Sequence, residues 1–285
     1  MSAEQAAPFA SAIALEPAGG GQFDARLGAG WTVGPKAHGG LLLALLAQAG
    51  LARLAVERPG PEFDPLAVSA DFLRAPDPGP VQLTTEVLRL GSTASVIGVR
   101  LLQAGRMMLV ATVTAGRLPA DPPVWAQLPE LVAEPGPDAI DPTRFDQVYG
   151  LARCCDVRWD PAGTAFVRGE QAAPQLRGWA RPRGEPTGVL FALLAGDILP
   201  PTVFNLDGQR GWAPTVQLTA LLRGRPAPGW LRIEAATRSV AGGWFDEDVT
   251  VLDSTGALIC QARQLALAPK LKPTDQAGGR ARPSN

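Results

Sequence analysis

The sequence contains very few of the residues on which most hydrolytic and metal-dependent chemistry depends. Its 285 residues include one histidine, His38, and three cysteines, of which Cys154 and Cys155 are adjacent and none belongs to a C-x-x-C pair. This composition argues against a disulfide framework and provides no zinc-ligand set. No G-x-S-x-G pentapeptide occurs, and the single histidine lies near the start of the chain, so a serine hydrolase of the α/β type is excluded as well.

The sequence also lacks an excess of charge of either sign. It has 26 Lys and Arg against 27 Asp and Glu, a formal net charge of -1, so no general attraction to nucleic acid or to anionic lipid is expected. The N-terminal stretch has no basic segment and its apolar part is short and broken, so we expect no signal peptide there. No other stretch approaches the apolar length needed to cross a bilayer, so we expect no membrane span in the chain. Together with the unpaired cysteines, these features predict a cytoplasmic protein.

What the sequence does have is an apolar helix near its start. Residues 38–49 read HGGLLLALLAQA, and the run of Leu and Ala favours a helix that is apolar on every side and must be wrapped by other structure. We expect it to extend to Val56 and to end before Pro59. Gly39 and Gly40 leave its first turn without side chains, so backbone N–H groups at the positive end of the helix are open to an incoming carbonyl oxygen.

Strand patterns surround this helix. Residues 1–20 are expected to form an edge segment or a loose arm, and residues 22–31 a first strand and turn. The helix is followed by four strand candidates at 66–73, 81–90, 95–103 and 107–115, separated by turn-rich segments. A helix followed by antiparallel strands defines an α+β unit.

The pattern then starts again. A Pro-rich, acidic segment at residues 118–143 is interpreted as a linker, and it divides the chain into units at 1–117 and 144–268. A polar tail at 269–285 is expected to be disordered. The second unit is predicted to contain an apolar helix at 188–195 and strands at 145–159, 175–182, 215–222, 230–237, 244–253 and 258–267.

The two halves can be aligned with each other. Gly40 falls on Gly188, an offset of 148, and Gly105 falls on Gly256, an offset of 151, with intermediate matches at intermediate offsets. Chance identities would not keep their order and spacing, so this slow drift favours a tandem duplication.

These residues resemble a known family. The order of Trp31, His38-Gly39-Gly40 with its apolar helix, Phe72-Leu73-Arg74 and the duplicated copy is similar to the double-hotdog acyl-CoA thioesterases related to bacterial thioesterase II. The resemblance implies two tandem hotdog units, each an antiparallel sheet wrapped around a central helix. It also implies an acyl-CoA substrate, no cofactor apart from the coenzyme A that is part of the substrate, and a homo-oligomer.

The family's catalytic set is an Asp near the second central helix, a Thr that opens the next strand and a Gln on the last strand. The resemblance carries these roles to Asp197, Thr215 and Gln264. The substrate is expected to contact His38, Gly39 and Gly40. The chain departs from the family at Gln217, where relatives often have an acid, so Thr219 is the alternative to Thr215.

The alignment of the halves makes this set asymmetric. Asp197 falls on Ala49 and Gln264 on Val113, so the first copy lacks both polar groups and one site is expected instead of two. In hydrolysis Asp197 would act as general base, or as nucleophile, while Thr215 and Gln264 aim the attacking water.

Several residues have a second interpretation. His38 either caps the helix or acts in catalysis, and Asp197 either caps a turn or acts as base. The cluster Arg177, Arg181 and Arg183 either meets the phosphates of coenzyme A or is solvated surface. The run Asp246-Glu247-Asp248 is interpreted as a solvated strand edge.

Two other functions fit the same fold. One is a non-catalytic acyl-CoA or lipid-binding protein, and the other is a hotdog enoyl-CoA hydratase or dehydratase. Fold alone does not distinguish them from a thioesterase.

Overall fold

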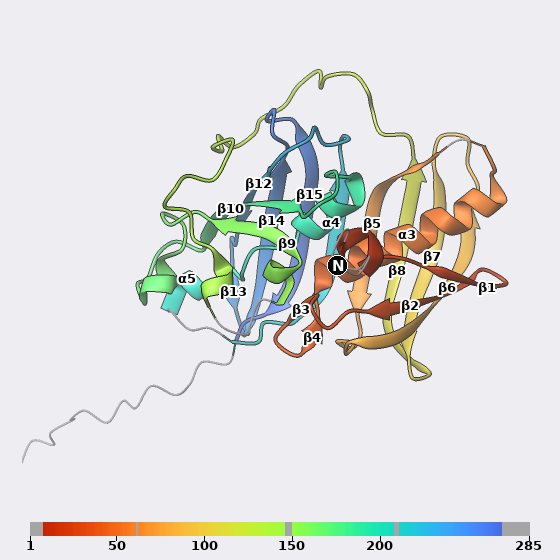
Figure 1. The fold of residues 1–285 in the computed structure, drawn as a ribbon, viewed down its shortest axis with the longest axis horizontal. Helices are drawn as coiled ribbons and strands as arrows, with labels where there is room; N and C mark the ends of the chain where they lie inside the picture. The colour runs from red at the N-terminus through yellow and green to blue at the C-terminus, as the bar shows by residue number, and fades with distance from the viewer. Residues whose placement is uncertain (1–7, 61, 146–149, 208–210, 270–285) are drawn as a thin grey trace, which may run out of the picture.

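The protein is built on one antiparallel sheet that both units share (Figure 1). The computed structural model describes residues 8–60, 62–145, 150–207 and 211–269. The strands follow the order β1-β2-β6-β7-β8-β5-β11-β15-β14-β12-β10-β9, with β13 paired to β14 alone. The orders β2-β6-β7-β8-β5 and β10-β12-β14-β15-β11 mirror each other across the β5–β11 pair, so the topology repeats as the duplication predicts.

The first unit contains one long helix. Its elements are α2 (Pro8–Ala12), β1 (Glu16–Gly19), β2 (Gln22–Leu27), β3 (Thr32–Val33), β4 (Lys36–Ala37), α3 (Gly39–Glu57), β5 (Asp64–Phe72), β6 (Gly79–Arg89), β7 (Ser95–Gln103) and β8 (Arg106–Gly116). Strands β3 and β4 form a separate two-stranded sheet.

The second unit contains the shorter central helix. Its elements are η1 (Pro142–Arg144), η2 (Gly150–Arg153), β9 (Cys155–Trp159), η3 (Ala165–Arg168), β10 (Gln175–Pro182), α4 (Val189–Ala195), α5 (Phe204–Asp207), β11 (Thr215–Leu222), β12 (Leu231–Ala236), β13 (Val240–Ala241), β14 (Trp244–Leu252) and β15 (Leu258–Leu267).

Helix α3 is the core helix that the Leu/Ala run predicts. Its residues from Gly40 to Ala47 are all buried, and strands β5 to β8 pack against it. By length and composition this helix could cross a membrane, which contradicts the expectation that no stretch is apolar enough. Most of it is buried inside the protein, so its hydropathy is explained by its position in the core.

The two central helices approach each other closely where α3 begins. A Cβ atom added to Gly40 would lie 2.7 Å from the carbonyl oxygen of Leu194 in α4, so no larger residue fits without a shift of backbone. This contact places Asp197, two residues beyond the end of α4, against the first turn of α3. The glycine pair therefore sets the distance between the units at this point.

The segments on either side of β9 differ in part from the sequence prediction. The strand predicted over residues 145–159 is wrong for its first part, because η2 precedes β9 and the strand begins only at Cys155; residues 146–149 lie outside the described part. Residues 117–139 contain no helix or strand, and η1 begins at Pro142, before the predicted linker ends. The predicted tail lies outside the described residues from 270 onward.

From residue 8 onward, the N-terminal segment packs at the edge of the sheet and is not a loose arm; residues 1–7 lie outside the described part. Strand β1 pairs only with β2, and the preceding helix α2 buries Phe9 against Trp31 and Phe191, with ring centroids 6.0 and 5.2 Å away. Glu185 accepts a hydrogen bond from the Phe9 N–H at 2.8 Å. The start of the described chain therefore bridges both units.

Candidate functional site

A cavity of about 390 Å³ lies where the two units meet. Its wall includes the start of α3, the end of β5, the segment after α4 and the start of β11, together with inward side chains of β14 and β15. Five of the six predicted site residues line it: His38, Gly39, Asp197, Thr215 and Gln264. The fold thus collects in one cavity residues that the sequence resemblance selected from both halves.

Asp197 lies over the N-terminus of α3. Its carboxylate accepts hydrogen bonds from the Gly40 N–H and from the Gln264 side chain, and it lies so close to position 39 that a Cβ there would be 2.6 Å from Oδ2 and would displace the carboxylate. Burial, and secondarily the charge of Glu247, raise the pKa of Asp197 to about 7. A carboxyl with this pKa is suited to general-base chemistry near neutral pH.

Gln264 connects the polar groups of the cavity. Its Oε1 accepts a hydrogen bond from Thr215 Oγ1 at 2.8 Å, and its Nε2 donates to Glu247 Oε2 at 2.6 Å and to Asp197. It shares the inward face of β15 with apolar residues and is buried, whereas Gln261 is exposed on the other face. Both ends of the amide of this polar side chain are therefore hydrogen-bonded within the apolar layer.

Thr215 reaches the cavity because β11 is irregular. The register of β11 against β15 shifts between Thr215 and Gln217, which indicates a bulge at Val216. In a regular strand, residues 215 and 217 would face the same side. Here Thr215 lines the cavity, while Gln217 donates to Ser69 and Thr219, at 3.0 and 2.7 Å.

The same geometry distinguishes Thr215 from Thr219, the alternative candidate for the catalytic threonine. Thr219 Oγ1 lies 2.7 Å from Ser69 Oγ, at the junction of β5 and β11, and does not line the cavity. Thr219 is therefore not brought to Asp197. The departure from the family at Gln217 likewise does not affect the cavity wall.

Glu247 was missed by the sequence interpretation. The prediction of a solvated strand edge is wrong for this residue, because β14 is paired on both sides and Glu247 is only 3% exposed. Its neighbours Asp246 and Asp248 do face outward and pair with Arg263. The alternation of buried residues along β14 was the available signal, since it assigns position 247 to the same face as Phe245 and Val249.

His38 is a helix cap. Its Nδ1 accepts a hydrogen bond from the Leu41 N–H at 3.3 Å, and its Nε2 lies 4.0 Å from Asp197 Oδ2. Burial lowers the pKa of His38 to about 4, although a hydrogen bond with the Asp197 backbone opposes the shift. The ring is therefore neutral at neutral pH with its Nδ1 lone pair occupied, which favours the capping interpretation over the catalytic one.

The first turn of α3 is less open than the glycine pair suggested. The Gly40 N–H donates to Asp197, the Leu41 N–H to His38 Nδ1 and the Leu42 N–H to the His38 carbonyl. Gly39 is half-buried and lines the cavity, and its N–H has no partner in the part of the chain that the structure describes. One backbone donor, and not two, is therefore available to a ligand here.

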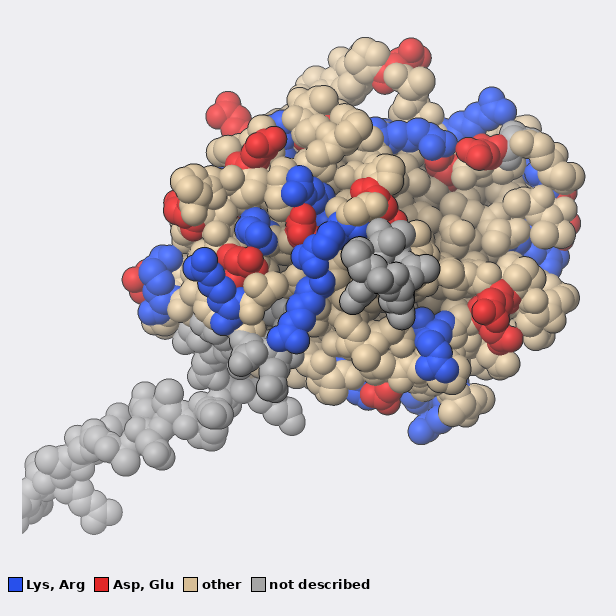
Figure 2. Space-filling model, in the orientation of Figure 1, with Lys and Arg blue, Asp and Glu red and all other residues tan. Residues whose placement is uncertain are grey.

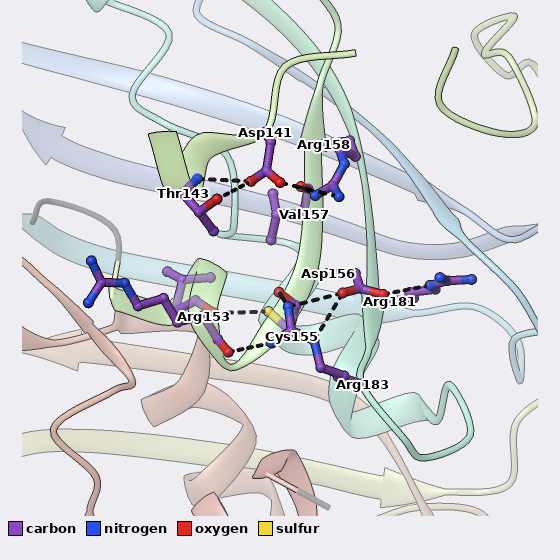
Figure 3. A network of polar contacts seen from close by, with 10 residues as sticks. Asp141, Thr143, Arg153, Cys155, Asp156, Val157, Arg158, Arg181 and Arg183 are labelled. Carbon is purple, nitrogen blue, oxygen red and sulfur yellow. Dashed lines mark hydrogen bonds and ion pairs between the residues drawn. The ribbon is translucent and has the colours of Figure 1, made fainter. Parts of the chain in front are cut away.

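The arginine cluster lies apart from this cavity. Arg181 and Arg183 donate to the two carboxylate oxygens of Asp156 at 3.0 and 3.1 Å, and Arg183 also donates to the backbone of η2 and β9 (Figure 3). Arg177 pairs with Glu234 at 2.8 Å. Basic and acidic side chains are interspersed on the face that Figure 2 shows, without a broad basic surface.

The sequence matches two domain families that together cover most of the chain. Residues 27–116 match the acyl-CoA thioesterase N-terminal domain, and residues 127–268 match the acyl-CoA thioesterase C-terminal domain. The chain therefore belongs to the acyl-CoA thioesterase family, as the resemblance implied. The second match begins within the predicted linker.

Individual relatives agree with this assignment. An uncharacterized protein of Mycobacterium tuberculosis is 39% identical over 92% of this chain and 98% of its own length. A Thermobifida fusca protein provisionally assigned to thioesterase II is 32% identical, with a TM-score of 0.80 over 93% of this chain and 98% of that one. A protein of unknown function with a hot dog fold from Alicyclobacillus acidocaldarius is 21% identical, with a TM-score of 0.78 over 93% and 98%. The α+β double-hotdog fold is thus confirmed.

Proposed function

We propose that this protein hydrolyses acyl-CoA thioesters to a free acid and coenzyme A, with Asp197 as the general base. The observation that carries the proposal is the position of Asp197 in the shared cavity, where Gln264 and the start of α3 hold its carboxylate and its pKa is about 7. Membership of the acyl-CoA thioesterase family supports the same substrate class.

The thioester would enter with its carbonyl oxygen toward the Gly39 N–H. This donor lies at the positive end of α3, so it stabilises the negative charge that the oxygen gains in the transition state. The acyl group would contact the apolar part of the wall, which includes Leu42, Phe72, Leu199, Phe204, Val216 and Phe245.

Water would attack the carbonyl carbon while Asp197 takes its proton. Thr215 donates its hydroxyl hydrogen to Gln264, so its oxygen lone pairs remain to accept a hydrogen bond from that water. Collapse of the tetrahedral intermediate breaks the C–S bond, and coenzyme A leaves as a thiolate that recovers the proton. Coenzyme A is a good leaving group, so no activated serine is needed.

A screen for thiol release tests this function. Purified protein is incubated with short, medium, long and aromatic acyl-CoAs, and free thiol is measured against protein-free controls. Hydrolysis of at least one substrate class supports the proposal. Tight binding of acyl-CoA without thiol release from any substrate would favour a non-catalytic binding protein.

A hydratase is the second candidate, and one observation favours it. Two carboxyl groups, Asp197 and Glu247, line the same cavity, and addition of water to an enoyl-CoA requires an acid and a base. Both oxygens of Glu247 are already hydrogen-bonded, which makes it a poor acid toward substrate. Loss of the enoyl absorbance without thiol release would support this alternative over hydrolysis.

The cellular location and the oligomeric state are also matters of proposal. We propose a cytoplasmic location, supported by three free cysteines, and a homo-oligomer, supported by the outer edge of β1, which pairs with no other strand in the described chain. Light scattering on the purified protein measures the oligomeric state, and a monomer would overturn the second proposal.

A further inference from the structure

Glu247 is a buried acid in the wall of the shared cavity, and the expected catalytic set does not include it. It lies directly opposite Gln264 in the β14–β15 ladder, and both of its oxygens accept hydrogen bonds. Oε1 accepts from the Thr202 N–H at 2.9 Å, and Oε2 accepts from Gln264 Nε2 at 2.6 Å. Burial of a charged carboxyl costs free energy, so its presence here points to a role in the cavity.

One consequence of this geometry is the orientation of the Gln264 amide. An amide can present either its nitrogen or its oxygen to a neighbour, and the neighbours decide which. Glu247 and Asp197 both accept hydrogen bonds, so they require the nitrogen on their side. The oxygen is then directed to Thr215, whose hydroxyl must donate to it.

A second consequence is electrostatic. The groups around the two carboxyls from the packed elements are His38 at the start of α3, Thr202 after α4, Thr215 on β11 and Gln264 on β15. None of them carries a positive charge at neutral pH, since His38 is neutral. Of the charged residues on neighbouring faces, Asp246 and Asp248 pair with Arg263 on the outer face of the sheet, and Arg74 at the cavity margin is exposed.

Two carboxyls that form no ion pair with Lys or Arg in the described part of the chain oppose each other's ionisation. Burial raises the pKa of Glu247, and the Glu247 charge contributes to the raised pKa of Asp197. A more basic Asp197 accepts a proton from water more readily.

We propose that Glu247 is a positioning residue for hydrolysis: it fixes the Gln264 amide with its nitrogen toward Asp197, and its charge makes Asp197 a stronger base. This inference rests on the proposed function for its kinetic part. Its structural part, the influence of Glu247 on the proton affinity of Asp197, can be measured without any substrate.

Glu247→Gln is the decisive variant, because it keeps the size of the side chain and removes its charge. The new amide can accept through only one of its two end atoms, so Gln264 must turn over or the Thr202 N–H loses its acceptor. Asp248→Asn is the matched control. It removes the same charge from the next residue of β14, whose side chain faces outward toward Arg238.

The experiment measures the titration of Asp197 by carboxyl carbon NMR in the free protein and the pH dependence of kcat/KM. Asp197→Asn identifies the Asp197 resonance. In Glu247→Gln, the titration midpoint of the Asp197 carboxyl should move to lower pH by about one unit. The acid limb of the pH profile of kcat/KM should move by the same amount. The plateau of kcat should fall by about threefold or more, because a weaker base accepts the proton less readily.

The Asp248→Asn protein should keep the wild-type midpoint. A Glu247→Gln protein that folds, as judged by circular dichroism, and shows the wild-type midpoint would overturn the proposal, even if its activity or thermal stability were lower. If the protein hydrolyses no acyl-CoA at all, the proposed function fails, while the NMR titration still decides whether Glu247 acts on Asp197. Glu247→Asp, which retains the charge, should keep the raised midpoint.

Discussion

Gln264 and Glu247 face each other across two adjacent strands, with 2.6 Å between Nε2 and Oε2. Both side chains lie in a face that is otherwise apolar. The pair extends to Thr215 on one side and to Asp197 on the other, so the cavity contains one connected polar network. Because such a network is buried, removal of one member leaves each group that it contacted with one hydrogen bond fewer.

Gln264→Ala tests this network. The substitution leaves Thr215 and both acids without their shared partner, so we expect a loss of about 1–3 kcal/mol in unfolding free energy and a fall of at least tenfold in kcat. Gln261→Ala is the control, because Gln261 is exposed on the opposite face of β15. Urea denaturation and a thiol-release assay measure both quantities. Equal effects of the two variants would contradict the assigned network.

Thr215→Val tests the position created by the bulge in β11. The change keeps the shape of the side chain but removes the hydroxyl that donates to Gln264, so we expect kcat to fall by about tenfold. Thr219→Val is the control, since that hydroxyl contacts Ser69 and Gln217 away from the cavity. A larger loss of kcat in Thr219→Val would restore Thr219 as the functional residue.

His38→Asn distinguishes a cap from a base. Asparagine can still accept a hydrogen bond from the Leu41 N–H, so we expect a fold of nearly wild-type stability and an acid limb of kcat/KM that remains near pH 7. His38→Ala lacks the acceptor and should lose about 1 kcal/mol of unfolding free energy. Disappearance of the acid limb in His38→Asn would identify the histidine, and not Asp197, as the titrating base.

The raised pKa of Asp197 also predicts a dependence of stability on pH. In the folded protein Asp197 keeps its proton up to about pH 7, whereas in the unfolded chain it loses the proton near pH 4. Between these values the folded state binds more protons, so this residue makes the unfolding free energy fall as pH rises. His38, with its pKa lowered to about 4, acts in the opposite direction between about pH 4 and 6.5.

The comparison of wild type with Asp197→Asn isolates the contribution of Asp197 to the pH dependence of the unfolding free energy, because the contribution of His38 is present in both proteins and largely cancels. We expect the variant to gain stability relative to wild type as pH rises from 4.5 to 7.5, by on the order of 3 kcal/mol. Urea denaturation at intervals of half a pH unit measures this difference. A difference that stays constant over the range would mean that Asp197 titrates normally.

The central helix and the repeated topology could both be predicted from the amino-acid sequence, because they depend on residue composition and on the order of matching residues in the two halves. The Leu/Ala run predicted α3, and the drift of matches between the halves predicted the mirrored strand order. The position of Thr215 was not predictable from alternation, because a bulge reverses the direction of the side chain. Glu247 was hidden by the two acids beside it, although its place in the alternation of β14 marked it as inward.

The first turn of α3 shows a different limit of sequence reasoning. Two glycines predicted open backbone donors, but the acid that occupies one of them comes from the other unit, 157 positions beyond Gly40. Which groups meet at the helix start is decided by the packing of α3 against α4, and that distance follows from the tertiary structure alone.

The central claim is that Asp197 provides the base for thioester hydrolysis, and Asp197→Asn tests it most directly. Thiol release from the best acyl-CoA substrate is measured together with the affinity of the same substrate by calorimetry. We predict that kcat falls by about 10²–10⁴-fold while the dissociation constant changes by less than about threefold. A variant that binds acyl-CoA and releases thiol at the wild-type rate would contradict the account.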